Sequence, residues 1–428
     1  MKQRLFILPI AVILLCMLTA CGDDTNGTLP ETIPQSDADS RNSEETADAS
    51  LTQPIPSEET EDISLTQSIP SDETADIGLT QPTPLEETEE ESGNTWIPTA
   101  MQDPAPTPEP EEIQITISAA GDVSLGNYYG QGYSGSFRET YDRLQDYNYF
   151  FENVYDIFSA DDMTIVNLEG MLTHAQERRE EQEYCISGDP EFVNILTAGS
   201  VEAVSMGNNH RPDYLQQGSD DTVKVLEETG IPYAYDQYTG IYETPQGVQI
   251  GFVSVCVTRE EPTGEKYLEE GITRLREAGC DLVFACCHWG IEREYHPNDF
   301  QKDLGRKCID WGADLVIGHH PHVIQGIEEY RGKYIVYSLG NFCFGANRNP
   351  KDKDCLIVQQ TFTFIDGALQ DETVLKVIPC SISSVSDRND YKPTPAEGKA
   401  AGRILDKLNQ SSLEFGLQFD QDGYPYKN

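Results

Sequence analysis

The alternation of apolar and polar positions from residue 113 onward predicts an α/β domain. Seven short segments are apolar and bounded by turn residues, as buried strands are, and helical patterns separate several of them. Strands that alternate with helices indicate a sheet buried between helical layers. The predicted strands are 113–120, 163–167, 203–206, 250–255, 281–287, 313–317 and 334–339, and the predicted helices are 150–158, 221–228, 267–278 and 300–311.

Polar side chains suited to chemistry follow five of these strands. In α/β sheets, functional groups collect in the loops after the strands. Each residue has a structural alternative: Asp122 could cap a helix, Asn209 could lie in a turn, and His288 could be a buried histidine with satisfied hydrogen bonds. Five equivalent positions together favour a functional site. The segments are Gly121-Asp122, Asn167-Leu168-Glu169-Gly170, Gly207-Asn208-Asn209-His210, His288-Trp289-Gly290 and His319-His320-Pro321-His322.

The last of these segments carries three of the chain's seven histidines, directly after the apolar run 313–317. Imidazoles where a strand gives way to a loop suit a transition-metal site, because the strand fixes the backbone while the loop lets the rings converge. The alternative is a surface loop that happens to be rich in histidine. The four other polar strand ends favour the metal site.

The amino terminus has the pattern of a bacterial lipoprotein signal. Residues 1–4 form a short basic region with Lys2 and Arg4, and the apolar run 5–18 is shorter than the roughly 20 residues that span a bilayer. Leu18-Thr19-Ala20-Cys21 has the form of a lipobox, which predicts lipidation of Cys21 after removal of the preceding residues. The alternative is a secretory signal with a chance cysteine. We therefore expect a lipid-anchored protein on the extracytoplasmic face of the cell membrane.

Residues 22–112 differ in composition from the rest of the chain. They contain 24 acidic residues, one basic residue (Arg41) and one aromatic residue (Trp96), and they repeat at a 14-residue step from Ser50. These repeats hold too few large apolar residues to offset the entropy of ordering. We expect a disordered, self-repelling linker between the membrane and a domain at 113–428. A folded or partner-binding repeat is the alternative.

The charge of the chain limits its partners. The formal net charge is −45, from 29 basic and 74 acidic residues. This balance argues against a nucleic-acid partner and against electrostatic binding to anionic lipid. A polyanionic substrate would have to be held by local cations or by metal.

The cysteines indicate no disulfide framework. Of eleven cysteines, Cys16 and Cys21 fall in the signal, which leaves an odd number. Cys280, Cys286 and Cys287 lie on or beside a predicted strand. Metal thiolates next to His288 are an alternative, but adjacent strand residues point to opposite faces, so we interpret these cysteines as core residues.

The five polar segments that follow the predicted strands together resemble the signature motifs of the poly-γ-glutamate capsule-synthesis (CapA/PgsA-like) family. The resemblance spans roughly residues 115–344, in the family's order, and includes Asp213, Glu292 and Tyr337-Ser338-Leu339-Gly340-Asn341-Phe342. That family is similar to the calcineurin-like metallophosphoesterases. The resemblance therefore implies a two-sheet sandwich flanked by helices for the domain at 113–428.

The resemblance also implies roles for single residues. His210 matches the histidine that faces the reacting group, and Asp213 in the same block is assigned with it to the catalytic residues. Two departures put the occupancy of one metal position in doubt: Ser124 stands where those phosphoesterases have histidine, and Glu169 stands where they usually have aspartate. His319 is an additional histidine, for which we expect a structural or positioning role. The implied metal ligands are Asp122, Glu169, Asn209, His288, His320 and His322.

Such a site would hold divalent manganese, iron or zinc, with two ions expected. Three functions stay open. The first is a surface-anchored, metal-dependent hydrolase acting in synthesis, export or hydrolysis of a capsule polymer. The second is a non-catalytic scaffold for polymer assembly, and the third is a phosphoesterase of broad specificity. The expected partners are the membrane, capsule-synthase components and an anionic polymer.

Overall fold

The computed structural model describes residues 110–258 and 262–427. The predicted signal peptide, Cys21 and nearly all of the predicted linker lie outside these ranges. Within them, no helix combines the length and the apolar character needed to cross a membrane.

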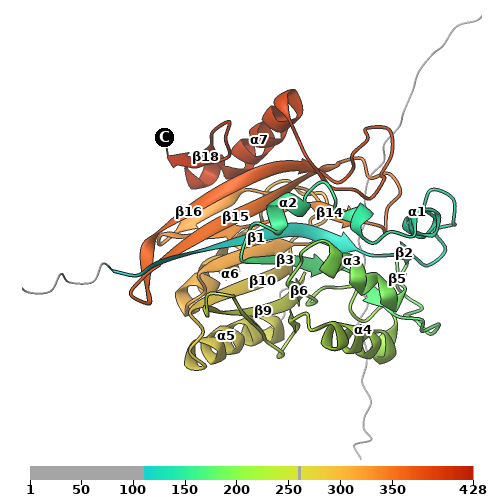
Figure 1. The fold of residues 1–428 in the computed structure, drawn as a ribbon, viewed down its shortest axis with the longest axis horizontal. Helices are drawn as coiled ribbons and strands as arrows, with labels where there is room; N and C mark the ends of the chain where they lie inside the picture. The colour runs from blue at the N-terminus through green and yellow to red at the C-terminus, as the bar shows by residue number, and fades with distance from the viewer. Residues whose placement is uncertain (1–109, 259–261, 428) are drawn as a thin grey trace, which may run out of the picture. The chain divides into compact units, whose positions relative to one another are not determined.

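Two β-sheets form the centre of the domain (Figure 1). The first has the order β17-β16-β15-β1-β3-β6-β7, with β14 beside β1, and the second has the order β12-β13-β11-β10-β9-β8. The first contains β1 (Glu112–Ser124), β3 (Met163–Leu168), β6 (Ala203–Ser205), β7 (Tyr233–Ala234), β14 (Asn341–Phe344), β15 (Asp354–Ile365), β16 (Ala368–Ser381) and β17 (Thr394–Pro395). The second contains β8 (Gly240–Glu243), β9 (Gln249–Val257), β10 (Leu282–Trp289), β11 (Leu315–His319), β12 (Ile327–Tyr330) and β13 (Lys333–Val336).

Helices and short strands complete the domain. The helices are α1 (Phe137–Leu144), α2 (Tyr155–Phe158), α3 (Val193–Ala198), α4 (Leu215–Thr229), α5 (Pro262–Glu277), α6 (Asp299–Trp311) and α7 (Gly398–Ser412), with 3-10 turns η1 (Asn148–Phe150), η2 (Pro190–Phe192) and η3 (Leu413–Phe415). The short strands are β2 (Asn127–Tyr128), β4 (Met171–Leu172), β5 (Ile186–Gly188), β18 (Leu417–Phe419) and β19 (Pro425–Lys427).

The two sheets pack face to face, because alternate residues of each strand point into a shared core. Ile117 of β1 and Phe284 of β10 belong to this core, and the rings of Phe284 and Phe362 stack across it with centroids 5.9 Å apart. On the outer face of the second sheet, Val283 and its neighbours pack against α5 and α6. The outer face of the first sheet packs against α1 to α4. The observed layers therefore confirm the predicted α/β sandwich flanked by helices.

All seven predicted strands are present, but two predicted helices differ. The segment 150–158 forms only the short helix α2 after irregular turns, because Phe150, Phe151 and Val154 all turn into the core beneath the first sheet. The prediction of a continuous helix there is wrong. α4 begins at Leu215, before the predicted residue 221. No element was predicted after residue 339, where the long β15–β16 hairpin and α7 lie.

The parallel strands of both sheets end at the same edge of the sandwich. Asp122 pairs with Asn167 on one side and with Asn341 on the other, and His288 pairs with His319 in the second sheet. β1 and β14 approach closely because residue 121 is glycine: a Cβ there would lie 2.0 Å from the carbonyl oxygen of Gly340. This register gathers the polar strand ends into one place.

Candidate metal centre

Asp122 lies at the centre of a cluster of histidines and amides. Its side chain is fully buried, and Asn167 Nδ2 donates a hydrogen bond of 2.9 Å to its Oδ1. His319 Nδ1 lies 3.2 Å from Oδ1, and His322 Nδ1 lies 3.1 Å from Oδ2. Burial alone would raise the pKa of this carboxyl, but the two histidines outweigh burial and hold the pKa well below its usual value. Asp122 is therefore a carboxylate ready to bind a cation.

Glu169 follows β3 and is also fully buried. Neither of its carboxylate oxygens takes part in a hydrogen bond with the described residues. Oε1 lies 3.5 Å from His210 Nε2 and 3.6 Å from His322 Nε2. Burial, together with the nearby Asp122, raises the pKa of Glu169 to about 7. A buried carboxylate without hydrogen-bond donors costs several kcal/mol, and a divalent cation is the group that would offset this cost.

The loop after β11 presents the remaining histidines through an unusual backbone. His320 and His322 both have positive φ, of 95° and 57°, a region that residues with a side chain rarely adopt. Such conformations persist only where surrounding contacts enforce them, and they concentrate at functional sites. Here the Arg293 N–H bonds the carbonyl of Pro321 at 2.8 Å, and Asn341 Nδ2 bonds the carbonyl of His322 at 3.3 Å.

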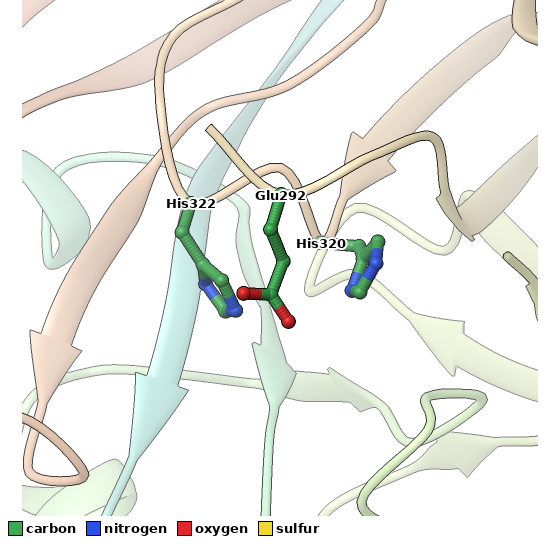
Figure 2. Close-up of side chains that lie close together, drawn as sticks. All are labelled: Glu292, His320 and His322. Carbon is green, nitrogen blue, oxygen red and sulfur yellow. The ribbon is translucent and has the colours of Figure 1, made fainter. Parts of the chain in front are cut away.

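Glu292 joins this loop from the turn after β10 (Figure 2). One ligand atom from each of Glu292, His320 and His322 lies within 4.8 Å of the other two. Figure 2 shows the carboxylate of Glu292 between the two imidazole rings. Asp122, Glu169 and His322 form a second group with the same spacing, so His322 belongs to both. Glu292 was absent from the predicted ligands, although its place two residues after His288-Trp289-Gly290 was a usable signal.

His288 and Asn209 form a pair beside these groups. His288 is buried, and its Nε2 lies 2.7 Å from Asn209 Oδ1. Its ring centroid lies 4.8 Å from that of His320. Burial first, and the neighbouring His320 second, lower the pKa of His288 well below the usual value, and burial lowers that of His320 to about 4. Both rings are therefore neutral at physiological pH, which is the form that binds metal.

His322 behaves differently from these two rings. Burial opposes its charged form, but Glu169 and Asp122 together outweigh burial and raise its pKa to about 10. The pocket thus favours positive charge next to its two buried carboxylates. A divalent ion would supply that charge and leave His322 as a neutral ligand.

His210 and Asp213 form a dyad at the rim of the cluster. His210 Nδ1 lies 2.7 Å from Asp213 Oδ2, an oxygen that also accepts the Ile186 N–H at 2.7 Å. The Asn208 side-chain oxygen accepts the backbone N–H of His210 at 3.1 Å, so the backbone of His210 is held as well as its ring. Burial lowers the pKa of His210, but Asp213 and Glu169 outweigh burial and raise it above the usual value. Because Asp213 engages Nδ1, the Nε2 atom of His210 faces Glu169 and can carry a proton.

The structure thus brings every candidate residue in the described ranges into one connected cluster. His319, for which we expected a positioning role, contacts Asp122 as described. The Ser124 hydroxyl is buried and has no hydrogen-bond partner in the part of the chain that the structure describes. The cluster opens into a cleft of about 860 Å³, lined in part by Asn209, His210, Glu292 and His322. Its carboxylate, imidazole and amide donors fit a divalent metal.

Fold and site define an α/β sandwich protein whose cleft carries a histidine- and carboxylate-rich candidate metal centre. Residues 116–346 match the family described as bacterial capsule synthesis protein PGA_cap. This match covers more than half of the chain, and the chain belongs to that family. The resemblance found in the sequence blocks is thereby confirmed.

Two curated relatives carry related names. The chain is 26% identical over 350 residues to "Capsule biosynthesis protein CapA" of Bacillus anthracis, which covers 76% of this chain and 82% of the relative. It is 31% identical over 264 residues to "PGA biosynthesis protein CapA" of Bacillus subtilis. That alignment covers 57% of this chain and 67% of the relative. A solved structure of a hypothetical protein from Thermus thermophilus aligns over 62% of this chain and 99% of its own, with 15% identity and a TM-score of 0.38.

Proposed function

We propose that the protein is a metal-dependent hydrolase that acts on an anionic capsule polymer of the poly-γ-glutamate type. The observation that carries this proposal is Glu169, a fully buried carboxylate that has no hydrogen-bond partner among the described residues and lies close to His210 and His322. Family membership and the names of the two Bacillus relatives support the polymer.

The donors are sufficient for two ions. Asp122 and Glu169 would hold one ion and His320 and Glu292 the other, and the neutral His322, which lies within range of both groups, would be a ligand of one of them. The pair of Asn209 and His288 lies beside His320 and offers further neutral donors. Mixed nitrogen and oxygen donors favour manganese, iron or zinc over calcium.

When bound, the metal would supply Lewis acidity and lower the pKa of a coordinated water. The protein's own residues would then orient the bond to be cleaved and move protons. His210 Nε2, directed toward Glu169, would donate a proton to the leaving group, because its Nδ1 is engaged by Asp213. Asp213 fixes the ring and favours its protonated form.

We also propose that Cys21 carries a lipid and that the acidic linker extends the domain away from the extracytoplasmic face of the membrane. The lipobox pattern and the composition of 22–112 support this proposal. Capsule-synthase components in the same membrane would be the partners.

Metal content and turnover, measured on one purified sample, test the proposal. We expect bound manganese, iron or zinc, and shortening of poly-γ-glutamate chains that stops in chelator. Glu169→Gln should lose metal and turnover together, whereas His174→Ala, whose ring is 74% exposed and outside the cluster, should change neither. Failure of the protein to bind any of the three metals would overturn the proposal.

Two further outcomes separate the alternative functions. Bound metal with cleavage of a chromogenic phosphodiester and no action on the polymer would favour a phosphoesterase. Bound metal or polymer with no turnover of either substrate would favour a scaffold.

A further inference from the structure

The wall of the cleft beyond the metal centre carries three cations that have no acidic partner among the described residues. Arg293, Arg348 and Lys351 all line the cleft, and all are exposed. Within residues 110–258 and 262–427 no carboxylate forms an ion pair with any of them, and the only hydrogen bond from these three side chains is from Arg348 Nη1 to the carbonyl of Ser134, at 2.7 Å.

Neighbouring cations of the same cleft are paired. Arg403 Nη2 lies 2.7 Å from Asp354 Oδ1, and Lys407 Nζ lies 2.7 Å from Asp352 Oδ2. The domain from residue 113 carries 50 acidic and only 26 basic residues, so carboxylates are plentiful. Three cations that form no ion pair with the described residues are therefore unusual in one cleft of so acidic a domain. Together they create a local positive potential.

Both loops that carry these cations are held in place. The backbone N–H of Arg293 donates a hydrogen bond of 2.8 Å to the carbonyl of Pro321, which connects this side of the wall to the loop that carries His320 and His322. Arg348 and Lys351 lie in the segment between β14 and β15, where Asn389 Nδ2 bonds the carbonyls of Phe344 at 2.9 Å and Asn347 at 3.0 Å. The backbone of the two loops that carry these cations is therefore held in place beside the metal centre.

We propose that Arg293, Arg348 and Lys351 bind successive carboxylates of an extended anionic polymer and guide it to the metal centre. This inference rests on the proposed function and adds the residues that select the substrate. A single exposed ion pair contributes little, but several carboxylates on one chain engage the three cations together. The planar guanidinium groups of the two arginines suit bidentate carboxylate contacts.

Binding of fluorescently labelled poly-γ-glutamate to the full chain tests the inference. The variant carries Arg293→Gln, Arg348→Gln and Lys351→Gln together. The matched control carries Lys224→Gln, Lys266→Gln and Lys399→Gln, which remove the same charge from exposed positions outside the cleft. We expect the affinity of the variant to fall about tenfold or more at low salt and its salt dependence to flatten, and the control to bind as the natural protein does. Equal affinity in the variant and the natural protein would overturn the inference.

Three further measurements make the result decisive. Lys351→Gln alone, which removes no hydrogen bond or ion pair with the described residues, should weaken binding without lowering the melting temperature. Tighter binding of polyphosphate than of poly-γ-glutamate would overturn the carboxylate assignment. Metal content separates the two proposals. If the protein contains metal and the triple variant binds the polymer as the natural protein does, only the proposed role of the three cations is contradicted. If the protein contains no metal but the triple variant binds the polymer more weakly, only the proposed metal-dependent hydrolysis is contradicted.

Discussion

His322 Nε2 lies 3.6 Å from Oε1 of Glu169, a fully buried carboxylate that accepts no hydrogen bond from residues 110–258 and 262–427. Without a metal ion, the imidazolium groups of His322 and of His210, whose Nε2 lies 3.5 Å from the same oxygen, are the positive charges that the pocket offers. The pair of His322 and Glu169 therefore links protonation of the histidine, ionisation of the glutamate and metal binding.

Glu169→Gln should have opposite effects on stability with and without metal. In chelator the variant should be more stable than the natural protein by about 1–3 kcal/mol above pH 7, because it removes a buried charge whose pKa is raised. With metal present the natural protein should gain stability and the variant should not. Thermal unfolding in chelator and in metal measures both. Equal metal-dependent stabilisation of the two proteins would show that Glu169 is not a ligand.

Glu292→Gln should lower metal affinity by about 10- to 100-fold, the range typical of losses near a metal. Glu292 is exposed, so the metal-free variant should melt as the natural protein does. Metal titration by calorimetry provides the measurement. Glu294→Gln, exposed in the same turn, is the control and should bind metal normally. Unchanged affinity of Glu292→Gln would remove this residue from the site.

His210→Ala should retain metal but lower turnover of the polymer by about 10²- to 10⁴-fold, the contribution of a general acid. Asp213→Asn should lower turnover less and shift the pH profile, because the ring remains but loses the anion that raises its pKa. Turnover rates across pH and metal analysis of the same samples would check both effects. Loss of metal from His210→Ala would instead make His210 a ligand.

Asp161 should make stability fall as pH rises. Burial raises its pKa from 3.8 to about 7, although Ser118 and Thr164 oppose this shift. The folded state therefore binds the proton more tightly than the unfolded state, and the stability that this proton contributes is present at low pH and is lost between about pH 4 and pH 7. Asp161→Asn should flatten the curve of melting temperature against pH in this window. Asp156→Asn, at an exposed position of α2, should leave the curve unchanged.

Cys21→Ser should abolish lipid attachment, because the lipobox pattern places the modified thiol at this residue. The expected result is release of the protein from the membrane fraction, or accumulation of the unprocessed precursor. Metabolic labelling with a fatty acid and cell fractionation would detect either. Labelling at the level of the natural protein would refute the lipidation.

The sequence was informative where local pattern determines structure. Cys286 and Cys287 were expected on opposite faces of one strand, and they lie in the central core and in the core beneath α5 and α6, respectively. The strand ends that carry Asp122 and His288 were also identified, since apolar runs and the polar residues after them are local features. These features place the candidate site at one edge of the sandwich.

Tertiary packing determined what the sequence did not reveal. Residues 150–158 carry a helical pattern, yet Phe151 stacks on Phe342, a contact distant in sequence, and only α2 remains helical. Glu292 was not predicted as a ligand because its proximity to His320 and His322 depends on how two separate loops turn. The positive φ of His320 and His322, which directs their rings, has no signature in residue type.

Asp354, at the start of β15, is bonded by Arg403 and Lys407 of α7, so the helix after the matched family segment braces the cleft loop. β15 also pairs along most of β1, the strand that ends at Asp122. A fragment that stopped at residue 346 would contain every candidate metal donor and still lack the strand and helix that fix them. The compact unit of this protein therefore extends through α7, and the residues beyond the family segment are part of its architecture.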